Sequence, residues 1–583
     1  MRYVLGSLKE KTIYDITEGA EENPLKNCAA KISKSTFSFE KNPILYNLPN
    51  SKSSDSKIFS SVFRAVGLNK YNKMLPFVIL KDRSESTGEI YIDKYILGED
   101  SDSLINEYNK ALNNYDIQSN KAIRDQENLV YIESYEKDTI DILRTLITYT
   151  DTGIAGQQQL NNKFIKDYNL EGNCDLMKVA AIKNIFTNSR LLLIYGAAGT
   201  GKTMLIDYIS TLMDGRNKLF MAKTHTAKQN LESRIKNPGA NSKFIGIDQF
   251  KKSKDKTVYD VVFIDECSTI DNRTMKTVLS KISKESLIVL AGDIFQIESI
   301  EFGNWFYYAK DILRHDSMVE LDSTWRTKDK ELIKLWDEVR YKKDCVTEVL
   351  AMDGPFSENI TKNILKENND DTIVLCLNYD GRFGLNNINS YFQDANKNSD
   401  YYKWHEWKYK IGDRILFNES KRFPCLYNNL KGKIIDIEKE EDKIIFSIEV
   451  ERNLTYFDVK NLDFISVEYL DETTLVKFAV YENNGGSTEE ERDLSKQRSI
   501  VPFQIAYAVS IHKSQGLEYD NVKIVIPSNG ASQITHGIFY TAITRARQNL
   551  KIYWSSETMK EVISNILTEE SSNKSLDIIK KKL

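Results

Sequence analysis

The chain lacks the features that mark several classes of protein. Among its 583 residues are 6 cysteines and 5 histidines; no two cysteines form a CxxC pair, and the histidines do not cluster with them. This scatter argues against a zinc site or a disulfide framework and is typical of a reducing compartment. No run of about 18 apolar residues occurs, and the first residues lack an apolar signal core, so we expect a cytoplasmic protein without a membrane span.

An excess of one charge is also missing. The chain has 80 Lys and Arg against 84 Asp and Glu, which gives a formal net charge of −4. A protein that binds nucleic acid needs only a local basic track, so this balance neither supports nor excludes such a partner. The length is too great for one hydrophobic core and predicts roughly three to four domains.

Residues 1–150 differ in texture from the rest of the chain. Strand-like runs occur at Pro76–Leu80, Glu89–Leu97 and Leu129–Ile132, and an apolar stripe at helical spacing covers Asp138–Thr150. This mixture of strands and helices predicts an N-terminal α+β accessory domain.

From about Gly153 onward, apolar strands alternate with amphipathic helices, which is the pattern of a parallel sheet covered by helices. A first α/β domain is expected over residues 151–317, with strands at Leu191–Tyr195, Leu219–Ala222, Val261–Ile264 and Leu287–Ala291. A second α/β domain begins near Met318, covers residues 318–407 and resumes over 476–583, where Lys580–Lys582 are predicted to lie in a solvated tail.

Residues 408–475 interrupt the second domain. Their short strands and charged turns predict a small β-barrel. Just before them, Trp404 and Trp407 are interleaved with lysines, which suits either stacking on a single strand or the packed edge of a small domain.

The strongest motif is a glycine-rich phosphate-binding loop. Residues 196–203, GAAGTGKT, match G-x-x-x-x-G-K-[ST] and stand between an apolar strand and a helix-like run. Backbone amides of such a loop and the following helix N-terminus bind phosphates, Lys202 neutralises the β- and γ-phosphates, and Thr203 binds Mg²⁺. The residues predicted to bind ATP here are Gly196, Gly199, Thr200, Gly201, Lys202 and Thr203.

Two acids complete the chemistry that such a loop needs. Asp265 and Glu266 stand at the end of a later buried strand, Val261–Ile264. Asp265 lies 63 residues beyond Lys202, which leaves room for one strand–helix unit between them. We expect Asp265 to hold Mg²⁺ and Glu266 to orient or activate the attacking water. The next strand ends at Gly292-Asp293, so Gln296 can reach a γ-phosphate.

Taken in order, these segments resemble superfamily 1 helicases, in particular the RecD/Dda-like (superfamily 1B) branch. The matching segments are GAAGTGKT at 196–203 for motif I, AKTHTA at 222–227 for motif Ia, DE at 265–266 for motif II, GDIFQ at 292–296 for motif III, LDSTWR at 321–326 for motif IV, SIHKSQGLE at 510–518 for motif V and YTAITRA at 540–546 for motif VI.

The resemblance implies two RecA-like parallel-sheet lobes that hydrolyse ATP between them, with an SH3-like insertion in the second lobe that helps to cover the nucleic acid. It implies that Gln296, Arg326 and Arg545 sense or stabilise the γ-phosphate. Gly516 and Glu518 would contact the nucleotide or support its site. The strand-binding residues implied are Thr224, His225, Ser510 and His512.

Two departures from the family pattern stand out. The glutamine that reads adenine in the family would fall near Lys178. Gln157, Gln158 and Gln159 lie earlier but match the family spacing only loosely, which puts adenine selectivity in doubt. The family carries its strand-splitting pin domain between positions equivalent to Gln249 and Val258, where this chain has only eight residues. Either residues 1–150, which we favour, or the 408–475 insertion splits the duplex, or the motor moves without strong unwinding.

The sequence therefore predicts an ATP-dependent DNA helicase or translocase that moves on single-stranded DNA, 5′→3′ by resemblance. Two alternatives stay open: an RNA- or RNP-remodelling ATPase, and an ATP-gated defence or sensor protein whose N-terminal domain binds a protein partner. Contacts with phosphates do not separate DNA from RNA, because only the 2′-hydroxyl distinguishes them at a backbone contact.

Overall fold

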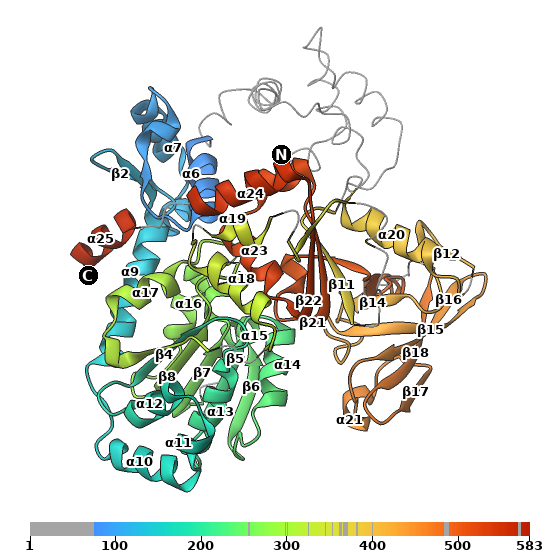
Figure 1. The fold of residues 1–583 in the computed structure, drawn as a ribbon, viewed down its shortest axis with the longest axis horizontal. Coiled ribbons are helices and arrows are strands. Elements are labelled where there is room, and N and C mark those ends of the chain that lie inside the picture. Colours follow the sequence, from blue (N-terminus) through green and yellow to red (C-terminus); the bar gives the residue numbers. More distant parts are fainter. Residues whose placement is uncertain are drawn as a thin grey trace. The chain divides into compact units, whose positions relative to one another are not determined.

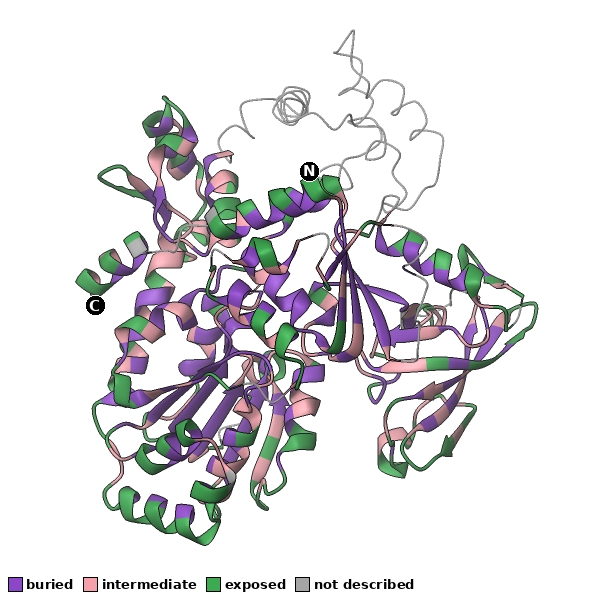
Figure 2. Cartoon of the chain, viewed as in Figure 1, coloured by how far each residue is buried: buried purple, intermediate pink, exposed green. Residues whose placement is uncertain are grey.

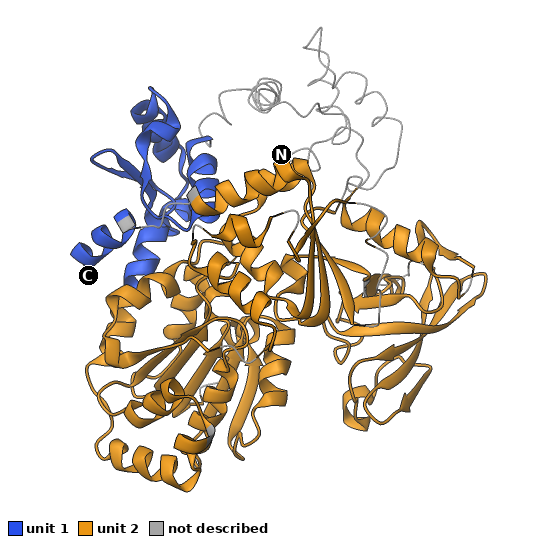
Figure 3. Cartoon of the chain, in the orientation of Figure 1, with its two compact units in different colours: residues 1–141, 572–583 blue, residues 142–571 orange. Residues whose placement is uncertain are grey.

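The computed structural model describes residues 75–583 apart from short stretches. The stretches left out are 255–256, 298, 300, 324–325, 344, 352–353, 361–363, 365–370, 380–382, 399, 483–484, 486–488 and 569–572. The chain divides into two compact units, residues 1–141 with 572–583 and residues 142–571 (Figure 3). None of the helices in the described part of the chain is long and apolar enough to cross a membrane.

Unit 1 is built around a three-stranded antiparallel sheet in the order β1-β3-β2. Its elements are α6 (Leu75–Thr87), β1 (Ile92–Asp93), η4 (Lys94–Leu97), α7 (Ser101–Ala111), α8 (Asn114–Gln118), β2 (Ile123–Gln126), β3 (Leu129–Ile132), the start of α9 (Glu133–Thr150) and α25 (Asn573–Lys582). β3 and α9 lie where the sequence predicted a strand and a helix. The strand predicted at Pro76–Leu80 is wrong: the run lies in α6, where a proline in the first turn is tolerated because its missing N–H needs no intrahelical partner.

Lys580 and Lys581 are exposed, as predicted, but the C-terminal residues form a packed helix and not an unstructured tail. They form α25, whose Ile579 is fully buried and whose Ser575 hydroxyl accepts a hydrogen bond from the Tyr91 amide. Lys582 pairs with the Glu136 carboxylate and lies over the Tyr91 ring. Leu576 and Ile579 are buried on one face of this last helix, which belongs to unit 1.

The first lobe of unit 2 is a six-stranded parallel sheet with helices on its faces (Figure 1). The strand order is β6-β5-β7-β8-β4-β9, with bounds β4 (Leu191–Gly196), β5 (Lys218–Ala222), β6 (Ser242–Gly246), β7 (Val261–Asp265), β8 (Leu287–Gly292) and β9 (Met318–Leu321). The helices are α10 (Gln157–Asp167), α11 (Leu170–Asn173), α12 (Leu176–Asn184), α13 (Lys202–Leu212), α14 (His225–Arg234), α15 (Ile247–Lys252), α16 (Asn272–Leu279) and α17 (Trp305–Ile312), with 3₁₀ turns η5 (Cys267–Thr269) and η6 (His315–Ser317).

The four strands predicted for this lobe are confirmed, but the strand at Met318 is assigned differently. It forms β9, which pairs in parallel with β4 and thus completes the first sheet instead of opening the second lobe. A short apolar strand carries no signal of which neighbour it will join, because pairing is decided by tertiary contacts.

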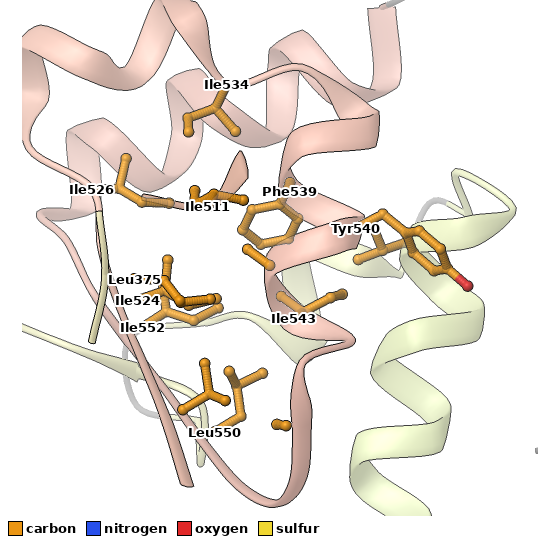
Figure 4. Close-up of a cluster of buried hydrophobic side chains, with 14 of the residues drawn as sticks. Leu375, Ile511, Ile524, Ile526, Ile534, Phe539, Tyr540, Ile543, Leu550 and Ile552 are labelled. Carbon is orange, nitrogen blue, oxygen red and sulfur yellow. The ribbon is translucent and has the colours of Figure 1, made fainter. Parts of the chain in front are cut away.

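The second lobe contains a five-stranded parallel sheet in the order β10-β22-β21-β11-β20. Its elements are α18 (Lys330–Arg340), α19 (Val346–Val349), β10 (Ser357–Glu358), β11 (Thr372–Cys376), α20 (Leu385–Ala395), β20 (Ala508–Ser510), η8 (His512–Ser514), β21 (Tyr519–Val525), η9 (Ser528–Gln533), α23 (His536–Ile543), β22 (Ala546–Tyr553) and α24 (Ser556–Thr568). Its core packs Leu375, Ile524 and Ile552 of the sheet against Phe539 and Ile543 of α23 (Figure 4). The central strands of both sheets are buried (Figure 2), as parallel strands covered on both faces must be.

The insertion is an antiparallel sheet in the order β17-β18-β16-β15-β14-β19, together with the hairpin β12-β13. Its elements are β12 (Tyr402–Trp404), β13 (Trp407–Tyr409), β14 (Arg414–Phe417), β15 (Lys431–Lys439), β16 (Lys443–Val450), α21 (Tyr456–Val459), β17 (Ser466–Tyr469), β18 (Thr474–Tyr481), α22 (Glu489–Arg498) and β19 (Phe503–Ile505). The sheet thus extends past residue 475, where the sequence predicted its end. A closed barrel stays a prediction, since the pairings leave β17 and β19 at opposite edges.

Trp404 and Trp407 take different positions in the hairpin. Trp404 is buried in the core of the insertion, whereas 58% of Trp407 is exposed. Burial of Trp404 supports the packed-edge interpretation for this residue, while Trp407 is available to a partner.

Candidate nucleotide site and strand-binding segments

A cavity of about 680 Å³ lies between the two lobes of unit 2. Among the residues that line it, Gly199, Gly201, Lys202, Thr203, Asp265, Glu266 and Gln296 belong to the first lobe, Arg326 follows β9, and Gly516, Glu518 and Arg545 belong to the second lobe. The structure therefore brings together all six residues predicted to be catalytic, although they span more than half of the chain.

The phosphate-binding loop connects β4 to α13. Gly199 and Gly201 have φ values of 81° and 86°, a left-handed conformation that side chains other than glycine rarely adopt. The loop is closed by Thr200, whose buried hydroxyl donates to Ala197 O over 3.0 Å, and a Cβ at Gly196 would come within 2.6 Å of that hydroxyl. The loop shape thus depends on glycine at these positions, and its amides open toward the N-terminus of α13.

Lys202 is the first residue of α13, and its ammonium is folded back onto the loop. Its Nζ donates to Gly196 O over 2.8 Å and to Ala197 O over 2.9 Å. Burial lowers the pKa of Lys202, which Asp293 and Asp265 partly offset. A neutral carbonyl is a weaker hydrogen-bond acceptor for an ammonium than a charged phosphate oxygen. A bound phosphate can therefore replace the two carbonyls as the partner of Lys202 Nζ.

Lys178, where the family pattern would have a glutamine, lies against the same loop. The side chain is fully buried and pairs with Asp175, the N-cap of α12. A Cβ at Gly201 would lie 2.9 Å from Lys178 Cε, so the lysine packs directly beneath the loop. Gln157 is buried elsewhere and donates to Asn161 over 2.8 Å.

The two acids lie at the carboxyl end of β7. Asp265 Oδ1 accepts from the Glu266 amide over 2.8 Å, and Glu266 has a φ of 54°, an uncommon conformation for a residue with a side chain. Burial raises the pKa of Asp265, and burial with the neighbouring Asp265 charge raises that of Glu266 to about 7. Glu266 Oε2 is buried and, among the described residues, has no hydrogen-bond partner. An unsatisfied buried carboxylate oxygen at the cavity wall is a natural acceptor for a water or ligand hydroxyl.

Gln296 follows β8 and faces the same cavity. Its side-chain amide donates to Asp293 Oδ2 over 3.0 Å, and Asp293 is itself buried. This hydrogen bond fixes the amide close to the phosphate-binding loop.

Two arginines enter the cavity from the side of the second lobe. Arg326 donates from Nη1 to Thr544 O and from Nη2 to Glu518 Oε1, both over 2.6 Å. Arg545 donates from Nε to Thr541 O over 2.9 Å and from Nη1 to Leu517 O over 3.1 Å. Burial lowers the pKa of Arg545 to about 10, so a nearby anion would be strongly favoured.

The donor set at the cavity fits a magnesium nucleotide. Thr203 and Asp265, a hydroxyl and a carboxylate, both line the cavity beside Lys202. Oxygen ligands of this kind suit Mg²⁺, which usually takes one or two protein ligands and completes its shell with phosphates and water. Among the described residues, no group of three or more His, Cys, Asp and Glu could hold a metal ion without such help.

Sequence reasoning missed one wall of the cavity. Ala227, Asn230, Leu231 and Arg234 of α14 line it, and Asn230 Nδ2 donates to Gly516 O over 3.1 Å. Arg234 lies 3.8 Å from the Glu518 carboxylate. Their spacing of three, four and seven residues marks one helix face, so the helical period after motif Ia was the available signal.

The predicted strand-binding residues fall into two kinds. The hydroxyls of Thr224 and Ser510 are engaged locally, since they accept from the amides of Ala227 and Lys513. His225 and His512 are exposed, each at the start of its short helix. The histidines are therefore better placed than the hydroxyls to meet a backbone phosphate.

A loop of the insertion contacts both of these segments. Asn428 O accepts from the Thr226 hydroxyl over 3.1 Å, and Asn429 Nδ2 donates to Lys513 O over 3.4 Å. Asn429 has a φ of 69°, which directs the loop between β14 and β15 into this position. The insertion thus reaches the motif Ia helix of the first lobe and the motif V turn of the second.

Comparison with known families agrees with this arrangement. Residues 178–354 match the family model described as AAA domain, and residues 505–553 match the UvrD-like helicase C-terminal domain. An uncharacterised protein of Methanocaldococcus jannaschii is 26% identical over 478 residues, which are 67% of this chain and 39% of that protein. The chain thus spans about two fifths of the length of that relative.

Two relatives that are matched over about three quarters of their own length are RecD subunits of the RecBCD enzyme. The RecBCD enzyme subunit RecD of Buchnera aphidicola subsp. Schizaphis graminum is 23% identical over 505 residues, 70% of this chain and 76% of that protein. The RecD subunit of Haemophilus influenzae is 23% identical over 519 residues, 76% of this chain and 77% of that protein.

Solved structures with a similar fold include Pif1 helicases. The enzyme from Candida albicans gives a TM-score of 0.42 at 17% identity, covering 74% of this chain and 98% of that one. Bacteroides Pif1 bound to ssDNA gives 0.38 at 15% identity, covering 70% and 94%. The two parallel-sheet lobes, the family matches and the RecD relatives together support a superfamily 1B helicase of the RecD type, an enzyme family that hydrolyses ATP.

Proposed function

We propose that the chain is an ATP-driven motor that moves 5′→3′ on single-stranded DNA and separates duplex strands. The observation that carries this proposal is the cavity between the lobes, because groups for binding and groups for activating a nucleotide enter it from opposite sides. Hydrolysis in such a cavity depends on how closely the lobes approach, which is the requirement for coupling chemistry to movement.

Each residue has a role that its position supports. The loop amides and Lys202 bind the phosphates, and Glu266 orients the attacking water and accepts its proton through the carboxylate. Arg326 and Arg545 stabilise the charge that spreads over the transferred phosphoryl group. Thr203 and Asp265 would hold Mg²⁺, which supplies further neutralisation of phosphate charge when bound.

The strand would lie over the lobes at His225 and His512. The insertion loop at Asn428 and Asn429 contacts both neighbouring segments, so it is placed to cover a strand that passes there. We propose single-stranded DNA as the strand, as the resemblance to superfamily 1B helicases implies.

The element that splits the duplex is proposed to be unit 1. Between α15 and β7 the chain has only residues 253–260, too few for a separate pin domain. A motor that pulls one strand needs a rigid obstacle, since each base-pair step costs about 1–2 kcal/mol to open. Unit 1 has its own sheet and core, as such an obstacle requires.

The test is an ATPase titration with single-stranded DNA, single-stranded RNA and no nucleic acid, repeated at several salt concentrations. We expect stimulation by DNA and an affinity whose logarithm falls with the logarithm of salt, because lysine and arginine contacts release counterions from phosphates. Stimulation by RNA alone would favour a remodelling ATPase. A rate that responds to neither would favour an ATP-gated switch with a protein partner.

A further inference from the structure

The segment after β8 leaves the first sheet and ends inside the core of the second lobe. Ile297 is a buried member of the hydrophobic cluster that also contains Leu335, Val339 and Phe539, and Phe295 packs against the same cluster. Gln296 stands between these two residues and faces the nucleotide cavity. A residue at the nucleotide is thus flanked by two residues that belong to the opposite lobe.

Phe295 occupies a socket made by α18 and α23. The guanidinium carbon of Arg340 lies 5.0 Å from the centroid of the Phe295 ring, a cation–π distance. The rings of Tyr341, His536 and Tyr540 lie at 6.1, 6.1 and 6.3 Å from it, all edge-to-face. In Figure 4, the Tyr540 side chain points to the opposite side of α23 from the side chains of Phe539 and Ile543. Contacts on several sides hold the Phe295 ring to the second lobe.

Ile297 and the Gln296 backbone are fixed to the same helix. The Ile297 amide donates to Thr541 Oγ1 over 2.9 Å. A Cβ at Gly537 would lie 3.1 Å from Gln296 O, so α23 approaches the Gln296 carbonyl as closely as glycine allows. The Gln296 carbonyl and the Ile297 amide therefore lie against the second lobe.

The side chain of Gln296 is hydrogen-bonded to the first lobe. Its amide donates to Asp293, which follows β8 of the first lobe and lies beside the phosphate-binding loop. The Gln296 backbone amide also donates to Asp293 O over 3.3 Å. Gln296 is thus bonded to the first lobe by its side chain and its amide, while its carbonyl and the next residue lie against α23 of the second lobe. A change in the approach of the lobes therefore acts on this segment from both sides.

We infer that Phe295 and Ile297 are positioning residues that transmit the state of the nucleotide from Gln296 to the second lobe. Neither lines the nucleotide cavity; they act by anchoring the chain on both sides of Gln296 to α18 and α23. The inference rests on the proposed function, since it explains how hydrolysis is converted to movement. Loss of the Phe295 anchor allows the lobes to slip past one another during hydrolysis.

The test compares Phe295→Ala with the unaltered chain and with Tyr391→Ala, which removes an aromatic ring from an exposed position of α20. ATP hydrolysis and movement along a single strand are measured on the same samples. For Phe295→Ala we expect hydrolysis within about threefold of normal, and ATP consumed per nucleotide moved to rise about five- to tenfold. Tyr391→Ala should leave this ratio unchanged.

Two results would overturn the inference. A normal ratio in Phe295→Ala would show that the socket carries no coupling, and an equal fall in hydrolysis and movement would show that Phe295 only supports the catalytic groups. If Phe295→Ala does not fold, Phe295→Leu keeps the apolar contact without the ring; a ratio raised about twofold supports the inference and an unchanged ratio overturns it. Absence of movement by the unaltered chain would overturn the proposed function, and the inference with it.

Discussion

The guanidinium of Arg326 lies 2.6 Å from the carboxylate of Glu518, so the arginine predicted to reach the γ-phosphate is paired with an acid of the second lobe. Arg234 of the first lobe lies 3.8 Å from the same carboxylate. Burial tends to raise the pKa of Glu518, but the charges of Arg326, Arg234 and Arg545 keep it below its usual value. In the absence of nucleotide, Glu518 thus neutralises the positive charge of these arginines. A bound triphosphate would take over that role.

Removal of Glu518 should reveal this compensation. In Glu518→Ala, only the bond to Thr544 O remains for the buried Arg326, and we expect the free energy of unfolding to fall by roughly 2 kcal/mol without nucleotide. Saturating ATP should restore most of the loss, because phosphate replaces the missing anion. Urea unfolding with and without ATP measures both quantities; an equal loss in the two conditions would contradict the role of Glu518 as a stand-in for phosphate.

Lys202→Ala should abolish ATP hydrolysis while the fold is kept. The substitution removes two hydrogen bonds to loop carbonyls, so a stability loss of about 1 kcal/mol is expected. The measurement is steady-state ATPase activity together with thermal unfolding. Turnover at the normal rate by a folded variant would disprove the assignment of the phosphate-binding loop.

Glu266→Gln should retain ATP binding but slow hydrolysis by about 10²-fold or more, because shape is kept while the proton acceptor is lost. Nucleotide affinity from fluorescence titration and turnover from single-cycle kinetics separate the two effects. A collapse of ATP affinity would instead make Glu266 a structural group or a metal holder.

His536 predicts a pH dependence of stability. Burial lowers its pKa to about 4, while the bond between Nε2 and Val339 O and the Asp293 charge oppose this shift and Lys342 adds to it. The folded state therefore favours neutral histidine: this contribution is present above pH 6.5 and is lost as the pH falls from 6.5 toward 4. The full effect is about 3 kcal/mol. His536→Gln should flatten the decline in unfolding free energy over this range, and an identical pH profile would argue against a buried neutral histidine.

Removal of unit 1 should separate movement from unwinding. Because α25 packs into that unit, the truncated chain must comprise residues 142–571 instead of merely starting near Thr150. We expect it to move on single strands but to lose fork unwinding, as measured in parallel assays. Equal unwinding by both chains would shift the splitting role to the insertion.

Local sequence patterns were enough to predict the chemistry of the nucleotide site. The glycine-rich loop, the acids after β7 and most strands of the parallel sheets follow from hydrophobic runs and from residues with special backbone conformations, which act over a few positions. The chemical types of Gln296, Arg326 and Arg545 were equally visible. Their roles came from the resemblance to a family, because spacing alone does not say which side chains meet.

The remaining features depend on contacts between segments that are far apart in the chain. β9 joined the first sheet, the last helix completed unit 1, and Phe295 and Ile297 entered the core of the opposite lobe. Each of these outcomes joins segments that are far apart in the chain. The identity of an apolar residue does not specify which distant residue it will pack against. Ile297 is buried in one lobe while Gln296 is bonded to the other. This arrangement exists only when both lobes are folded, so no local sequence pattern could predict it.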